Sequence, residues 1–212
     1  MNNISLALQI DQAAQIIKNG GVVAFPTDTF YGLGCDPFNA NSVEKIYRLK
    51  NRPSYKAILL LISSLKMLDK CVVLDKLSKK QQEYFQTLIK NFWPGPLTMV
   101  LPASDLLPSN LISPEKTVGV RYPDYIVAQE LAKAIGGVIT ATSANLSGQA
   151  NTETPIEVKV QFGSSLGYIL DGGKSPGGEA SSVVDLTSDL PILVREGRIS
   201  RTTLVTLLGN LA

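Results

Sequence analysis

Apolar residues follow two patterns along this chain, stripes with helical spacing and short continuous runs. The stripes predict helices near residues 11–19, 41–49, 64–70, 78–92, 125–135 and 200–208, with one more beginning at Thr154-Pro155. The runs predict strands at residues 21–25, 57–62, 97–101, 117–121, 138–142, 168–170, 182–186 and 192–195. No repeat or linker divides the chain. We therefore expect a single α/β domain over residues 1–212, a twisted mixed β-sheet flanked by helices.

Capping residues and prolines mark several helix ends. Asn41-x-x-Glu44 and Ser78-x-x-Gln81 match the capping box, in which polar side chains bond the first helical turn. Pro155 suits the first position of a helix. The helix from Ser78 must stop at Trp93-Pro94-Gly95-Pro96, because proline offers no amide hydrogen to the helix. We interpret this last segment as a structural corner.

Polar loops recur where the predicted strands end. They lie at residues 27–29, 50–56, 117–121, 142–145, 181–182 and at Arg195. Ligands of open α/β sheets gather at such strand ends. None of the loops matches the phosphate-binding loop or the dinucleotide-binding glycine pattern. The loops instead predict an anion site built from cations and hydroxyl groups.

The segment 48–56 is the strongest candidate for that site. It holds Arg48, Lys50, Arg52 and Lys56 and no acidic residue. Pro53 ends the preceding helix and favours extended geometry at 51–52, so we expect the cations to fan out from a turn. Arginine offers a phosphate two parallel hydrogen bonds and lysine a point charge. The alternative is a solvated basic turn without a ligand.

Composition narrows the possible chemistry. The net charge of +2 is too small to indicate a dedicated nucleic-acid-binding protein. The chain has no histidine, which excludes Ser-His-Asp and Cys-His catalysis and any histidine metal site. An enzyme of this composition would act through positioning and electrostatics, or with a metal held by carboxylates and substrate phosphates.

Two thiols, Cys35 and Cys71, provide no disulfide framework. Residues 1–11 lack a basic leader followed by an apolar run, and the apolar run 57–62 is far too short for a membrane span. We therefore expect a cytoplasmic protein that does not contact membranes.

Each polar motif also has a purely structural interpretation. Residues 27–29, Ser143 and Asn145 could serve only as turn residues. Arg121 could pair with a surface carboxylate. The glycines in 172–180 could form flexible turns, or a mobile loop that closes over a ligand.

Taken together, the motifs resemble the YrdC-like threonylcarbamoyl-AMP synthases, also called TsaC. The matching segments are Pro26–Gly34, Lys50–Pro53, Trp93–Thr98, Val118–Pro123, Thr142–Gly148 and Ser181–Asp185. They stand in family order across residues 10–200 and include the Lys-x-Arg and Ser-x-Asn pairs. The resemblance implies the short, single-domain type, whose twisted sheet carries a large basic concave face.

The resemblance also implies a reaction. L-Threonine, bicarbonate and ATP would give threonylcarbamoyl-adenylate and pyrophosphate, which makes the protein a nucleotidyltransferase. A separate transferase complex would then use the adenylate to make N6-threonylcarbamoyladenosine in tRNA. Mg2+ would be bound through the phosphates of ATP and not by a protein metal site, and any contact with RNA would be weak.

Roles for individual residues follow from the same resemblance. The catalytic set would be Lys50, Arg52, Ser143 and Asn145. The ATP-binding set would be Arg52, Lys56, Thr117, Ser143 and Arg195. The threonine-binding set would be Thr29, Arg121 and Ser181.

Some positions depart from the family pattern. Longer members tend to have asparagine where Lys56 stands and histidine near Leu61, so the resemblance does not establish the ligand contacts at positions 56 and 61. Phe30 in place of valine is expected to be silent. Two other functions stay open. One is an RNA-binding or ribosome-assembly factor that uses the basic concavity, and the other is a paralogue acting on another carbamoyl or acyl adenylate.

Overall fold

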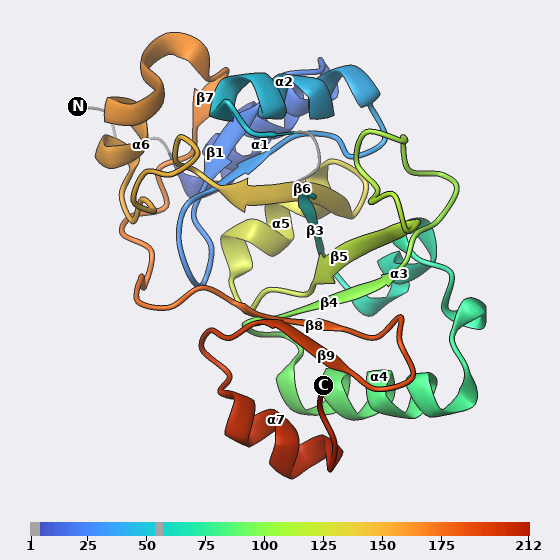
Figure 1. Cartoon of the computed structure of the whole chain (residues 1–212). Helices are drawn as coiled ribbons and strands as arrows, with labels where there is room; N and C mark the ends of the chain where they lie inside the picture. The colour runs from blue at the N-terminus through green and yellow to red at the C-terminus, as the bar shows by residue number, and fades with distance from the viewer. Residues whose placement is uncertain (1–4, 54–56) are drawn as a thin grey trace.

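A computed structural model describes residues 5–53 and 57–212 and contains one mixed sheet (Figure 1). Within these ranges the sheet has nine strands in the order β7-β1-β2-β6-β3-β5-β4-β8-β9. The strands are β1 Val23–Phe25, β2 Gly32–Gly34, β3 Leu59–Ile62, β4 Leu97–Pro102, β5 Thr117–Arg121, β6 Val138–Ser143, β7 Tyr168–Ile169, β8 Ser182–Asp185 and β9 Ile192–Arg195. The pairs β1–β7, β3–β5 and β4–β8 are parallel and the others are antiparallel.

Helices cover the sheet and its ends. They are α1 Leu6–Lys18, α2 Ala40–Lys50, α3 Leu68–Cys71, α4 Lys79–Phe92, α5 Ile126–Ala134, α6 Pro155–Phe162 and α7 Arg201–Leu208. Three short 3-10 helices complete the described elements: η1 Leu65–Met67, η2 Leu74–Lys76 and η3 Gly163–Ser165. The predicted α/β class with a mixed sheet and flanking helices is confirmed. Among the described helices, none has the length and apolar content needed to traverse a lipid bilayer.

The two faces of the sheet bury different apolar clusters. Leu60 and Ile62 of β3 point into the larger cluster, which includes residues of α2 and α4. Leu59 and Leu61 point to the other face, where α1 and α5 pack over β1 and β6. The same two leucines also line a cavity that extends over β5, β4 and β8. The candidate site therefore lies on this face, beside the area that α1 and α5 cover.

Most predicted helix starts are confirmed. The capping box of Ser78 with Gln81 is present at α4, and Thr154 and Glu157 form a second one at α6, which begins with Pro155. The predicted box at Asn41 is wrong. Asn39 caps α2 instead, because its side-chain oxygen accepts the backbone N–H groups of residues 41 and 42.

Two features of the loops differ from the sequence prediction. No strand is predicted between residues 26 and 56, yet the segment 26–34 contains the short strand β2, which pairs with both β1 and β6. Asn51 does not take extended geometry ahead of Pro53. Its φ of 48° and ψ of 42° are left-handed, and its N–H returns to the carbonyl of Arg48 as the C-cap of α2. Asparagine tolerates this conformation better than most residues with a side chain.

Candidate active site

An open cavity of about 380 Å³ lies over the ends of the central strands. Its floor is apolar and comes from β3, β5, β4 and β8, with Leu59, Gly119, Val100 and Val183 among the lining residues. Loops before β2, after α2 and before β8 supply polar side chains around this floor. The arrangement offers an apolar surface beside hydrogen-bonding groups, as ligand pockets commonly do.

The structure brings together most of the residues predicted for the site. Those that line the cavity are Thr29, Arg52, Thr117, Arg121, Ser143, Ser181 and Arg195. Three of them are arginines, and among the described lining residues none carries a carboxylate. The cavity wall is therefore suited to an anion. Lys56 lies outside the described residues.

Lys50 and Asn145 lie together, but behind the cavity wall. The Lys50 side chain is 1% exposed, and its Nζ donates to the carbonyls of Ser143 and Asn145, the latter at 2.5 Å. It also lies 3.4 Å from Asn145 Oδ1. Neither residue is among those that line the cavity. The lysine thus joins the end of α2 to the end of β6, which carries Ser143, and to Asn145 just after it.

Burial changes the acidity of Lys50. Desolvation, and to a lesser extent the charge of Arg52, lower the pKa of its ammonium group from 10.5 to about 7. The three oxygen acceptors around Nζ favour the charged form and counteract part of that effect. The group therefore titrates close to neutral pH.

Arg121 is held by two of the predicted motifs at once. Its Nε donates to the Gly95 carbonyl at 2.9 Å, and its Nη2 forms an ion pair with Asp28 Oδ2. Its Nη1 lies 3.4 Å from Thr29 Oγ1. The residue is 4% exposed, so the carboxylate that neutralises it is a buried one and not a surface group. The corner at Gly95 and the turn at 27–29 both orient this guanidinium.

Asp28 was not predicted as a site residue. It lies in the motif 26–34 and is itself 7% exposed. Its Oδ1 is buried and accepts no hydrogen bond among the described residues. The sequence indicated only a turn here, since no local pattern reveals a partner that lies 93 positions away in the chain. One feature of the sequence could have pointed to Asp28: it is an acidic residue between two hydroxyl residues, in a chain that also has an arginine predicted to bind an anion.

Ser181 is fixed from two sides. Its Oγ lies 3.0 Å from Thr98 Oγ1 and 3.1 Å from Arg195 Nη2. Arg195 also donates from Nε and Nη2 to the Ser181 carbonyl, at 3.1 and 2.7 Å. Thr98, 2% exposed, is a further residue that the sequence did not single out although it ends the motif 93–98.

Arg52 and Thr117 complete the polar wall. Arg52 Nη2 donates to the Ala57 carbonyl at 2.8 Å, and burial lowers the pKa of its guanidinium without removing its charge. Thr117 Oγ1 lies 2.9 Å from Ser113 Oγ. Within the part of the chain that the structure describes, no group of three acidic or cysteine side chains could hold a metal ion.

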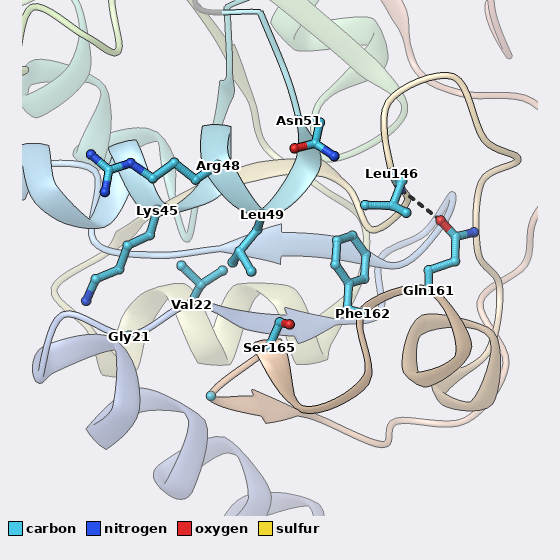
Figure 2. Close-up of a pocket in the computed structure, with 11 residues that line it drawn as sticks. Gly21, Val22, Lys45, Arg48, Leu49, Asn51, Leu146, Gln161, Phe162 and Ser165 are labelled. Carbon is cyan, nitrogen blue, oxygen red and sulfur yellow. Dashed lines mark hydrogen bonds between the residues drawn. The ribbon is translucent and has the colours of Figure 1, made fainter.

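A second, larger cavity of about 610 Å³ lies between α2 and α6, as Figure 2 shows. Its two cations already have partners, because Lys45 Nζ donates to the Gly20 carbonyl at 2.7 Å and Arg48 Nε pairs with Glu44 at 3.1 Å. None of the residues predicted for the site lines it. The smaller cavity is therefore the candidate active site.

Comparison with known proteins identifies the family. A family model described as "Sua5_yciO_yrdC: Telomere recombination" matches residues 15–197. The chain belongs to this family. The resemblance that the sequence motifs indicated is thus confirmed.

Relatives in the Sua5–YciO–YrdC family cover nearly the whole chain. Threonylcarbamoyl-AMP synthase of Pyrococcus abyssi is 36% identical over 199 residues, 94% of this chain and 57% of the relative. The Bacillus subtilis enzyme of the same name is 36% identical over 202 residues, which are 95% of this chain and 57% of the relative. The Vibrio vulnificus (strain YJ016) enzyme is 36% identical over 189 residues, which are 89% of this chain and 98% of the relative. The chain therefore spans little more than half of the first two relatives.

Solved structures of the family agree with the fold. P. abyssi Sua5 complexed with L-threonine superposes with a TM-score of 0.90 and 33% identity, covering 100% of this chain and 61% of that one. Escherichia coli YciO gives a TM-score of 0.80 and 32% identity, covering 92% of each chain. Both confirm the α/β architecture described above.

Proposed function

We propose that this protein is a threonylcarbamoyl-AMP synthase, which forms L-threonylcarbamoyladenylate and pyrophosphate from L-threonine, bicarbonate and ATP. The observation that carries the proposal is the cavity wall. Three arginines and several hydroxyl groups from motifs far apart in the chain line one cavity, in a member of a family whose relatives bear this name.

One half of the cavity suits an amino acid. Arg121 would bind the threonine carboxylate, because its guanidinium is held in one orientation by Gly95 and Asp28 before any ligand arrives. Thr29 Oγ1 lies 3.4 Å from Arg121 Nη1, and Ser181 lines the same cavity, so both hydroxyls could bind the ammonium or hydroxyl group of threonine. A preoriented cation of this kind loses little entropy on binding.

The other half suits a nucleoside triphosphate. We assign phosphate contacts to Arg52, Thr117, Ser143 and Arg195, and to Lys56 as the sequence predicts. The apolar floor around Gly119 offers a surface for an adenine base. Mg2+ would be bound through the phosphates of ATP, which agrees with the lack of carboxylates among the described lining residues.

The chemistry needs concentrated positive charge. The threonine amine and bicarbonate would combine into a carbamate with loss of water. A carbamate oxygen would then form a bond to the α-phosphorus of ATP, and the bond to the bridging oxygen would break to release pyrophosphate. Negative charge is present on each reactant, so the arginines would stabilise the transition state electrostatically. We assign Lys50 and Asn145 the task of holding Ser143 in place.

We also propose the basic face, the domain organisation, the downstream partner and the cellular location. The three arginines would form the basic concave face, within a single domain of residues 1–212. The adenylate would pass to a threonylcarbamoyl transferase complex that modifies tRNA, with at most weak contact between this protein and RNA. We expect this to take place in the cytoplasm.

Pyrophosphate release tests the proposal. We expect release from ATP and bicarbonate to depend on L-threonine and to be weak with serine or other amino acids. Arg52→Ala should abolish it while the melting temperature stays near that of the unchanged protein. Release that is absent with every amino acid, from a folded protein that binds ATP, would contradict the proposal and favour a paralogue. Steeply salt-dependent RNA binding without ATP would favour an RNA-binding protein.

A further inference from the structure

The strap, defined here as residues 172–181, connects β7 to β8 along one side of the cavity. Figure 1 shows it in orange, running down to β8. The strap joins a strand at one edge of the sheet to a strand next to the opposite edge. Ala180 and Ser181, at its end, line the cavity. Its position therefore affects the shape of the site.

One residue of the strap, Gly177, is held by both of its backbone polar groups. The Gly177 N–H donates to the Thr29 carbonyl at 2.8 Å, and the Gly177 carbonyl accepts from Arg198 Nη2 at 2.6 Å. Gly177 has a φ of +68°, and a side chain there would place its Cβ 2.1 Å from Glu153 Oε1. The positive φ favours glycine at this position, and the two hydrogen bonds orient the backbone of Gly177.

Arg198 holds the strap at a second point. Its backbone N–H donates to the Ala180 carbonyl at 3.0 Å. The neighbouring Gly197 packs so closely that a Cβ would lie 2.2 Å from the same carbonyl oxygen. The turn between β9 and α7 therefore packs directly against the end of the strap.

The two points at which the strap is held are next to residues of the half of the cavity that is predicted to bind the amino acid. Thr29, which accepts from Gly177, has its hydroxyl beside Arg121. Ser181 follows Ala180 in the chain and contacts Thr98 and Arg195. Arg198 itself is not among the residues that line the cavity. It therefore influences the site through the strap and, at longer range, through its charge. Burial lowers the pKa of Arg121, and the charge of Arg198 contributes to that lowering.

We propose that Arg198 is a positioning residue for threonine: by holding the carbonyls of Gly177 and Ala180, it sets the positions of Thr29 and Ser181. A charged donor suits this task, since hydrogen bonds from a guanidinium are stronger than neutral ones. The inference rests on the proposed function, because it assigns that half of the cavity to the amino acid.

Three variants test the role. Arg198→Met removes the guanidinium but keeps a flexible apolar stem and the backbone bond to Ala180. Arg198→Lys keeps a cation and a donor. Arg201→Met is the matched control, because Arg201 is exposed and, among the described residues, its side chain bonds just the Leu211 carbonyl, at 3.5 Å. The measurements are steady-state pyrophosphate release and calorimetric titration with L-threonine.

We expect Arg198→Met to raise KM and Kd for L-threonine about tenfold, the effect of losing one charge-assisted hydrogen bond. KM for ATP should stay close to that of the unchanged protein. Arg198→Lys should restore part of the threonine affinity, and Arg201→Met should change nothing.

Several results would overturn the inference. An equal rise of KM for threonine and ATP, accompanied by a lower melting temperature, would show a merely structural role. Unchanged threonine binding in Arg198→Met, or the same loss in Arg201→Met, would remove the basis for positioning. Failure of the proposed function would look different: the unchanged protein would release no pyrophosphate in response to threonine, and both proposals would fall.

Discussion

Asp28 and Arg121 form an ion pair away from solvent, and this controls what their substitution does. Both residues are less than 10% exposed, so each charge has given up most of its hydration. A buried ion pair adds little to the free energy of unfolding. Removing one partner lowers that free energy strongly, because the other charge stays buried without compensation. Thr29 and Gly95 contact the same guanidinium, so the pair also connects stability to the geometry of the site.

We predict that Asp28→Asn lowers the free energy of unfolding by about 3–5 kcal/mol, because Arg121 keeps its charge without a counterion. Urea denaturation measures this. Glu130→Gln is the control, since Glu130 pairs with Lys133 at 3.4 Å on the surface, where such pairs contribute about 1 kcal/mol or less. Equal losses in the two variants would show that the buried pair behaves as a solvated one.

Lys50 should make stability depend on pH. Its pKa is about 7 in the folded protein and 10.5 when unfolded, so the unfolded chain binds the extra proton between these values. The free energy of unfolding should therefore contain a contribution that rises with pH above about 7. In Lys50→Met this contribution is absent, so the stability deficit of the variant should widen from about pH 7 to about pH 9.

Urea denaturation of both proteins over that range checks the Lys50 prediction. Burial raises the pKa of Cys35 and of Cys71 to about 12, and these thiols titrate in both proteins, so their effect cancels in the difference. A deficit that stays constant with pH would mean that Lys50 remains charged throughout, held so by its three oxygen acceptors.

At the level of elements, the sequence predicted what depends on local pattern. The helix from Ser78 has an apolar stripe, a capping box and a proline stop, and α4 lies within those limits. The strand β2 escaped prediction because Gly32-Leu33-Gly34 shows no alternation of apolar and polar residues. It exists because β1 and β6 offer backbone partners on both sides. Tertiary pairing of this kind leaves no local trace.

Close packing around β2 leads to a prediction about its glycines. A Cβ at Gly34 would lie 2.6 Å from Ile139 Cδ1 and 2.7 Å from Phe25 Cε1, two buried side chains. We expect Gly34→Ala to destabilise the protein by about 1–3 kcal/mol through overpacking. Gly32→Ala is the control on the same strand, because its nearest neighbour would be 3.5 Å away. Thermal unfolding gives the melting temperatures of the two variants, and equal melting temperatures would contradict the prediction.

At the scale of the whole molecule, the sequence motifs predicted which residues come together but not whether their side chains reach the cavity. Residues from six segments do gather around one cavity, as their family order implied. Two aspects could not be foreseen. Lys50 and Asn145 meet behind the wall instead of in the cavity, and Asp28 neutralises Arg121. Both depend on the path of the chain in three dimensions, which a motif does not encode.

The strap gives a prediction at the same scale, since it spans the sheet and ends in the cavity wall. No residue of 172–180 belongs to a helix or strand, and within the described part of the chain three of its backbone N–H groups, those of Gly173, Ser175 and Gly177, donate hydrogen bonds. Few backbone bonds allow local opening, and a ligand that contacts Ser181 should oppose it. We expect ATP with L-threonine to slow amide hydrogen exchange in residues 172–180 and to leave α4 unchanged. Exchange in the strap that is equal with and without the ligands would show that it does not close over them.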